Sequence, residues 1–337
     1  MTVTRTVALS PALAAAIIGL LTLSPPAAIG ATLPATLVTI NAVLQTAKPG
    51  DKVVLSGSGY VQVNNSANPM LDLQGVVIDA SGLTGAVFYA ANVKNFTLKG
   101  GQYLGTNWKG GIYIAGYANV TVDAPVVVGG LTLMDGQNVL VQNAVMTAGP
   151  VFIRTTKAFR VTGTKTTGAD ADGIDIDPCS SYGRVDHNLI TSSNAKNGAH
   201  PDAVQLQNGT KACPDGAHYV EIDHNRAEGA TAGYDAWGNS GYGGGVGLYV
   251  HDNEVFNNYS WGGALDNCKS CVLADNHVGT LAGAPWPSSF DSRGSTDIVR
   301  CGNVIDRYTS PAGRTWPGGK EASCTAAQKS AAAALAR

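Results

Sequence analysis

The chain has 337 residues, a formal net charge of −2 and charged side chains at only 14% of its positions. Lysine and arginine form no dense run, which argues against nucleic acid or an anionic membrane surface as a partner. The 42 glycines favour a fold with many tight turns over a helical one.

The first 30 residues have the pattern of an export signal. Arg5 gives a positive start, residues 11–23 are apolar, and residues 28–30 offer small side chains for cleavage. We expect residues 1–30 to be removed and the mature protein to be secreted or periplasmic. An uncleaved anchor is the alternative, but the apolar run is short for a bilayer.

One short pattern recurs along the rest of the chain: an apolar-rich strand, a polar pair, and then often asparagine. Copies end at Asn143, Asn188, Asn225, Asn253, Asn276 and Asn303. Such a repeat indicates a solenoid, in which each turn buries its apolar residues by stacking on its neighbours. We predict an all-β domain over 31–325, a single-stranded right-handed parallel β-helix. The Ala-rich tail 326–337 is either helical or disordered.

The recurring asparagine predicts a ladder of side-chain amides at one corner of the solenoid, bonded to one another and to the turn backbone. His187, His224 and His251 lie inside the same repeated corner. We therefore interpret these three histidines as turn residues and not as ligands.

A second strand precedes this corner in each turn, and its side chains alternate between core and solvent with a period of two. The expected core set is Ile112, Ile114, Leu131, Leu133, Val151, Ile153, Ile174, Ile176, Val204 and Leu206. The solvent-facing set is a stripe of Tyr113, Thr132, Met134, Phe152, Arg154, Asp175, Asp177, Gln205, Gln207, Asp266, Asp291 and Arg293. Carboxylates, amides and guanidinium groups that converge on one surface indicate a functional groove, with a plain solvated face as the alternative.

The segment before the first turn also carries a pattern. Residues 37–47 are amphipathic and predict a capping helix, and Ala-Lys-Pro-Gly-Asp at 47–51 leads into an apolar strand at 53–55. This opening and the asparagine corner resemble the pectate-lyase-like right-handed β-helix superfamily. The resemblance implies activity on a polysaccharide, as in polysaccharide lyases and polygalacturonase-like enzymes.

All six cysteines lie after the expected signal, and an even count in an exported chain predicts disulfides. Cys179 and Cys213 follow equivalent strands of consecutive turns, so stacking is expected to pair them. Cys301 is expected to hold the C-terminal segment through Cys324, which leaves the pair Cys268–Cys271. The Cys-x-x-Cys spacing of this last pair also occurs in redox and zinc sites, which is the less favoured interpretation.

Four carboxylates crowd into eight residues, at Asp170, Asp172, Asp175 and Asp177. Such crowding costs Coulomb repulsion unless a cation or a shared proton offsets it. We therefore predict Ca²⁺ at Asp175 and Asp177, with a solvated acidic turn as the equal alternative.

Residues 172–175 resemble part of the Asn-Thr-Asp-Gly signature of polygalacturonase-type glycoside hydrolases, although Asp and Ala replace its first two residues. One turn later, His200 and Asp202 stand where that family has paired aspartates. The resemblance implies an acid and a base carboxyl group, here Asp172 or Asp175 with Asp202.

A lyase instead needs a base beside the uronate carboxyl group and a group that stabilises the resulting anion. His200 or Arg293 is predicted as that base, with Asp202 and Asp172 also in the catalytic set. The residues predicted to bind the sugar chain are Arg154, Gln205, Gln207, Asp266, Asp291 and Trp237. We predict a secreted, monomeric enzyme that cleaves a uronate-containing polysaccharide by β-elimination. A polygalacturonase-type hydrolase, a uronate C5-epimerase and a non-catalytic adhesin remain open.

Overall fold

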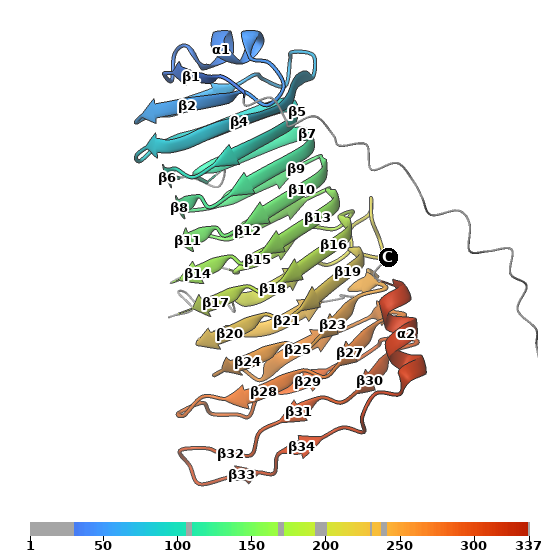
Figure 1. Cartoon of the computed structure of the whole chain (residues 1–337). Helices are drawn as coiled ribbons and strands as arrows, with labels where there is room; N and C mark the ends of the chain where they lie inside the picture. The colour runs from blue at the N-terminus through green and yellow to red at the C-terminus, as the bar shows by residue number, and fades with distance from the viewer. Residues whose placement is uncertain are drawn as a thin grey trace, which may run out of the picture.

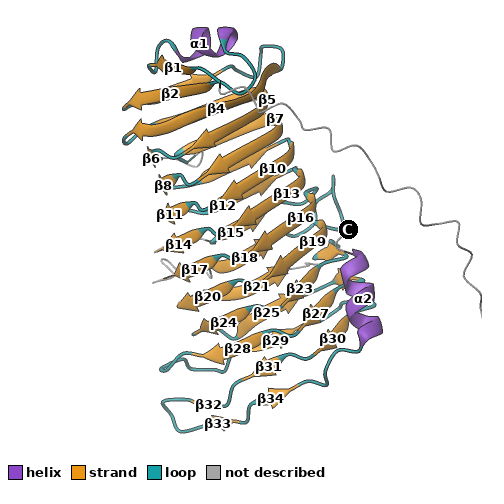
Figure 2. Ribbon diagram, viewed as in Figure 1, coloured by secondary structure: helices purple, strands orange, loops and turns teal. Residues whose placement is uncertain are grey.

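The structure is a computed structural model, and it describes residues 30–105, 110–167, 172–192, 201–229, 231–236 and 241–335. The chain forms a right-handed parallel β-helix of about ten turns, as predicted. Its axis runs from helix α1 (Ile40–Thr46) at the N-terminal end to a small hairpin at the C-terminal end (Figure 1). Each turn in the middle of the solenoid contributes three short strands (Figure 2), and equivalent strands stack into three faces.

The three faces are named here by the order in which the chain enters them. The first face comprises β9 (Leu131–Met134), β12 (Val151–Arg154), β15 (Ile174–Ile176), β18 (Asp202–Leu206), β21 (Ala232–Ala236), β25 (Trp261–Leu265) and β29 (Ser289–Asp291). The second face comprises β10 (Gln137–Gln142), β13 (Lys157–Thr162), β16 (Ser181–Asp186), β19 (His218–Asp223), β22 (Gly245–Val246), β23 (Tyr249–His251), β26 (Cys268–Lys269), β27 (Val272–Ala274) and β30 (Val299–Cys301). The third face comprises β6 (Gln102–Leu104), β8 (Val126–Val128), β11 (Val145–Thr147), β14 (Lys165–Thr167), β17 (Leu189–Ser192), β20 (Arg226–Gly229), β24 (Glu254–Asn257), β28 (His277–Thr280), β31 (Val304–Ile305) and β34 (Gly319–Lys320).

The N-terminal turns differ from the later ones because their strands are not interrupted at the corner between the first and second faces. The long strands β4 (Leu71–Leu83), β5 (Val87–Lys99) and β7 (Ile112–Asp123) run across both faces, and β1 (Thr32–Ala35), β2 (Lys52–Gly57) and β3 (Tyr60–Val63) begin the stack. Helix α1 covers the end of this stack with the buried side chains of Ile40 and Leu44. The predicted capping helix is therefore present, with shorter bounds because Ala47 is already extended.

The core inside the three faces follows the predicted alternation. All ten residues expected to point inward, from Ile112 to Leu206, are fully buried. Each turn alone exposes one layer of these side chains, so burial depends on the turns above and below. This dependence explains why both ends of the solenoid carry covering segments.

The predicted asparagine ladder lies at the corner between the second and third faces. Its members are Asn188, Asn225, Asn253, Asn276 and Asn303, and each side-chain amide donates to the carboxamide oxygen of the next at 2.8–3.0 Å. The same amides also donate to strand carbonyls of the preceding turn. All five residues are buried, so the ladder satisfies backbone groups that water cannot reach.

One expectation about this corner is wrong, because Asn143 is not a member of the ladder. It lies one position earlier, since Gln142 aligns with Asp186 through Thr162. The residue with positive φ keeps the same register from turn to turn, as at Asn143, His187, His224 and Asp252, and the ladder position follows it. In the turn of Asn143 the buried Ala144 occupies that position.

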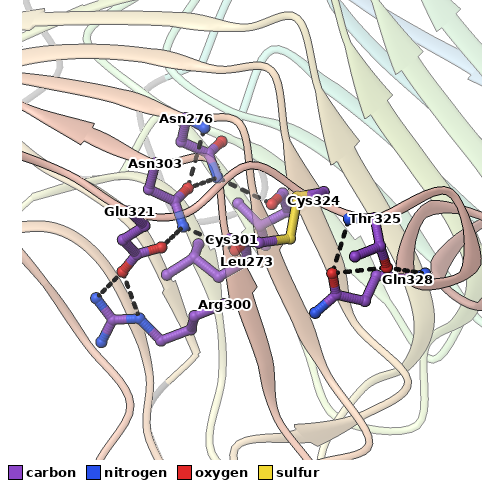
Figure 3. Close-up of a disulfide and its surroundings, with 10 residues drawn as sticks. Leu273, Asn276, Arg300, Cys301, Asn303, Glu321, Cys324, Thr325 and Gln328 are labelled. Atoms are coloured by element: carbon purple, nitrogen blue, oxygen red, sulfur yellow. Dashed lines mark hydrogen bonds and ion pairs between the residues drawn. A yellow bond between two sulfur atoms is a disulfide. The ribbon is translucent and has the colours of Figure 1, made fainter.

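The three disulfides are the predicted pairs, Cys179–Cys213, Cys268–Cys271 and Cys301–Cys324. Figure 3 shows that the last of these lies beside the end of the asparagine ladder, where Asn303 donates to Glu321 and Arg300 also binds Glu321. It anchors helix α2 (Ala326–Leu335), so the described part of the Ala-rich tail is helical and lies against the second face (Figure 1). Among the described residues, neither helix is long and apolar enough to cross a membrane.

Candidate functional site

The outer side chains of the first face form columns that run along the solenoid. Strand register places in one column Tyr89, Tyr113, Thr132, Phe152, Asp175, Gln205, Asp235, Ala264 and Asp291. The predicted stripe therefore exists, and its character changes along the axis. The N-terminal part is aromatic, while the part from Asp175 onward is acidic.

Asp175 occupies the transition between these two parts, between the core residues Ile174 and Ile176. It is 5% exposed, and burial together with the charges of Asp172 and Asp177 raises its pKa from 3.8 to about 7. Near neutral pH the group is therefore present in both protonation states. A carboxyl group with this pKa can deliver a proton at physiological pH, which an ordinary aspartate cannot do.

In the next two turns, Asp202 and Asp235 place two fully buried carboxyl groups near each other. Burial and the nearby Asp202 carboxyl group hold the pKa of Asp235 well above the usual range. Two buried carboxyl groups at such close range favour a state in which one of them is protonated. The Asp202–Asp235 pair is thus built to carry one proton at pH values where exposed aspartates carry none.

Amide side chains connect these two acidic centres. Gln205 Nε2 donates to Asp202 Oδ2 at 2.8 Å, and Gln207 Nε2 donates to Asp175 Oδ2 at 3.2 Å. Gln207 also donates to Oε1 of Gln205, and the backbone N–H of Asp202 donates to Asp172 Oδ1 at 2.8 Å. The predicted residues of two consecutive turns therefore form one hydrogen-bonded network.

The two arginines predicted for this face are both engaged with carboxylates. Arg154 Nε lies 3.3 Å from Asp177 Oδ2, and its guanidinium group also lies over the Phe152 ring at 4.8 Å. Further along the axis, Arg293 Nε lies 2.7 Å from Asp291 Oδ2, and the Arg293 backbone N–H donates to Asp266. Asp266, Asp291 and Arg293 form a separate group beyond the Asp202–Asp235 pair.

The aromatic part of the column is continuous with the acidic part. The rings of Tyr89 and Tyr113 are stacked with centroids 5.3 Å apart, and Tyr60 lies 6.4 Å from Tyr89. Tyr60 is exposed and Phe152 is half-buried. Aromatic rings in such an arrangement offer flat apolar surfaces beside hydrogen-bonding groups, which is the combination that a sugar ring contacts.

The predicted calcium ligands do not form an obvious cation site. Asp177 is already paired with Arg154, and Asp175 is buried with a raised pKa. Within the described residues, the one cluster of three His, Cys, Asp or Glu residues with ligand atoms within 4.8 Å comprises Glu221, Asp223 and His251 on the second face. The donor set at Asp175 and Asp177 therefore does not fit Ca²⁺ by itself.

Two predicted site residues, His200 and Trp237, lie outside the described residues, so their roles stay predictions. Two other residues were missed. Asp235 is absent from the predicted stripe, although alternation around Tyr234 places it there. Tyr259 lies close enough to Asp202 for that charge, after burial, to raise its pKa, and the sequence carries no signal for this proximity.

No protein-family model matches the chain, and no curated protein matches it. Solved structures are similar over most of its length. A surface adhesin of Streptococcus pneumoniae has a TM-score of 0.54 at 13% identity, covering 81% of this chain and 88% of the adhesin. An alginate lyase from Paenibacillus sp. has a TM-score of 0.49 at 14% identity, covering 79% of this chain and 98% of the lyase. The similarity to the adhesin shows the β-helix fold, and the activity must be argued from the site.

Proposed function

We propose that this chain is a carbohydrate-active enzyme that cleaves an acidic polysaccharide bound along the first face. The observation that carries the proposal is the run of buried carboxyl groups at Asp175, Asp202 and Asp235, with raised pKa values at Asp175 and Asp235. Crowded buried acids destabilise a fold, so their presence on an outer face favours a catalytic role over a structural one.

The arrangement suits glycoside hydrolysis. Protonated Asp175 donates its proton to the glycosidic oxygen as the bond from that oxygen to the anomeric carbon breaks. The ionised member of the Asp202–Asp235 pair takes a proton from the water that attacks the anomeric carbon. Asp175 and Asp235 lie two strands apart in the column, which is about 9–10 Å between backbones. Inverting hydrolases separate their carboxyl groups by about 6.5–9.5 Å.

One observation supports β-elimination as a second candidate. Tyr259 lies near Asp202, where a phenol can act as the acid or base of an elimination. The Gln205 and Gln207 amides and protonated Asp175 are neutral donors that can stabilise the anion formed beside a uronate carboxyl group.

Export from the cytosol is part of the proposal. Three disulfides in a chain of this size favour an oxidising compartment. The expected export signal covers residues outside the described part of the chain. Polysaccharides large enough to lie along several turns also occur outside the cell membrane.

The test is an assay of the purified full chain against polygalacturonate, alginate and a neutral glucan. New reducing ends without ultraviolet absorbance from unsaturated ends support hydrolysis, while both signals in equal amounts support elimination. A chelator added to a parallel reaction tests the calcium prediction. Binding to these polymers with neither signal would contradict the enzyme proposal and leave the adhesin interpretation.

A further inference from the structure

The second face carries its own cluster of polar and aromatic side chains, far from the acidic column in the fold. The cluster lies on β13, β16 and β19 and is called here the donor patch. Its members are Arg160, Tyr182, Arg184, His187, Tyr219 and His224. It takes no part in the proposed cleavage, which uses the first face.

Tyr182 and Tyr219 occupy equivalent corners of consecutive turns and have φ angles of 56°. Earlier turns place Asn119, Asn138 and Ala158 at this corner, also with positive φ. Asparagine adopts this conformation readily, while a bulky side chain is rare there and strained. The two rings nevertheless stack at 5.3 Å between centroids, and Tyr182 is 46% exposed. Tyr219 is half-buried, and the Lys157 ammonium group lies over the Tyr182 ring at 5.4 Å. Backbone strain that holds the Tyr182 side chain exposed in this position points to a binding role for it.

A second ring pair stands at the other end of the same strands. His187 and His224 stack at 5.1 Å with planes 3° apart. Each Nδ1 atom lies within 2.8 Å of a carboxylate oxygen, of Asp186 and Asp223 respectively. The Nε2 edges therefore face away from these carboxylates. The ring pairs bracket the outer surface of β16 and β19.

Two arginines lie between the ring pairs, and their carboxylate partners are hidden beneath them. Arg160 donates through Nε and Nη2 to Asp186 at 2.8 and 2.7 Å, and Arg184 donates in the same way to Asp223 at 2.9 and 2.7 Å. Both carboxylates are fully buried, while the arginine side chains are 49% and 40% exposed. Glu221, which is partly exposed, also lies 3.7 Å from Arg184. The exposed part of the two arginines therefore presents N–H donors to solvent above carboxylates that are mostly buried.

A groove leads into the donor patch along the solenoid axis. It has a volume of about 630 Å³, and Arg160 and Tyr182 line its end. Asn119 and Asn138 line its start, with their amides linked at 2.9 Å. From the turn of Asn119 to that of Tyr219 there are four strand steps, roughly 19 Å. This length matches an extended chain of several sugar units better than a single small molecule.

We propose that the donor patch and its groove form a second, non-catalytic binding surface for an acidic polysaccharide. Sugar units contact the exposed side of the Tyr182–Tyr219 pair, and carboxylate or sulfate groups accept hydrogen bonds from the exposed N–H groups of Arg160 and Arg184. These exposed donors, with Lys157 beside Tyr182, select an occupant rich in anionic acceptors. The inference shares with the proposed function only the class of polymer, because it uses a different face.

The test is native gel electrophoresis of the full chain in gels that contain polygalacturonate, alginate or neutral dextran. The wild type is expected to be retarded by an acidic polymer, less so at high salt, and not by dextran. The double variant Tyr182→Asn/Tyr219→Asn is expected to bind about tenfold more weakly, since each lost ring removes a stacking contact. Asparagine suits this corner in earlier turns, so the fold is retained.

Two further variants separate this inference from the proposed function. Tyr242→Asn removes another exposed tyrosine outside the donor patch and is expected to bind like the wild type. Asp175→Asn is expected to lose cleavage but keep its retardation. Unchanged retardation of the double Tyr variant, or equal retardation of the wild type by dextran, would overturn the second binding surface even if cleavage is found.

Discussion

Buried carboxyl groups occur on both the first and the second face, but their surroundings are opposite. On the second face, Asp186 and Asp223 each accept two hydrogen bonds from an arginine. Burial alone would raise the pKa of Asp186, but the bonds from Arg160 and His187 outweigh it and lower the pKa. On the first face, Asp235 lies near another carboxyl group, Asp202, and its pKa is raised by burial and by that neighbour.

The two faces therefore treat buried carboxyl groups differently, and the second face shows the arrangement that favours stability. The second face satisfies each carboxylate with a cation, which is the arrangement that a structural role requires. The first face leaves acid beside acid over several turns, and the fold carries the resulting cost. The same scaffold can supply either arrangement, so the uncompensated one is the stronger indication of chemistry.

The largest expected effect comes from removing the proton donor of the first face. Asp175→Asn is expected to lower turnover by about 10²–10⁴-fold, because an amide cannot transfer the proton. Turnover on the best polymer from the panel measures this. Asp79→Asn, at a surface ion pair with Lys52 in an early turn, is the matched control and is expected to keep wild-type turnover. A folded Asp175→Asn protein with unchanged turnover would remove Asp175 from the mechanism.

The second effect is a pH dependence of stability with opposite sign on the two faces. The pKa of Asp175 is about 7 in the folded chain and 3.8 as the reference value, so the folded state holds a proton that the unfolded chain releases between about pH 4 and 7. Stability from this group is therefore complete below about pH 4 and falls as pH rises towards 7, by at most ~4 kcal/mol. Asp186, with its lowered pKa, contributes stability above about pH 4 and loses it on acidification.

Thermal unfolding of the wild type and Asp175→Asn between pH 4 and 8 measures the pH-dependent contribution of Asp175 to stability. The variant is expected to gain stability relative to the wild type as pH rises, with little difference near pH 4. Equal pH profiles for the two proteins would contradict the raised pKa of Asp175.

The third effect tests the paired carboxylates of the second face. Arg184→Met leaves buried Asp223 without its guanidinium partner and is expected to cost about 3 kcal/mol in the free energy of unfolding. The same change at Arg154 on the first face is expected to cost at most about 1 kcal/mol, because its pair with Asp177 is partly exposed. Denaturant unfolding of both variants gives the comparison, and similar losses would show that the two faces do not differ as described.

Local sequence patterns predicted most of the fold. The alternation that buries Ile174 and Ile176, the amide ladder and all three disulfides depend on residues that repeat or alternate over short distances. These features follow from side-chain direction in a strand and from stacking of equivalent positions. The sequence could therefore locate the first face and most of its polar residues.

Register between turns was harder to predict, and the site depends on it. Neighbouring positions in the stack are separated by 19 residues at Asn119 and Asn138 but by 37 at Asn188 and Asn225. Because the loops between turns vary in length, the spacing in the sequence does not show which residues become neighbours in the stack. The Asp202–Asp235 pair joins two turns, so no pattern within either turn reveals it.

The smallest expected effect extends the amide ladder by one turn. Thr164 holds the ladder position before Asn188, and its backbone N–H donates to the Asn188 carboxamide oxygen at 2.8 Å. Its buried Oγ1 has no hydrogen-bond partner among the described residues. Thr164→Asn places an amide where it can donate to Asn188 and to the carbonyl of Val141, and is expected to stabilise the fold by about 1 kcal/mol.

Thr166→Asn is the control, since Thr166 is equally buried but lies between Met146 and Ile190, and an amide there is expected to cost about 1–3 kcal/mol. Thermal unfolding distinguishes the two, and a loss of stability in Thr164→Asn would mean that the ladder ends at Asn188 because the turn above cannot accept an amide.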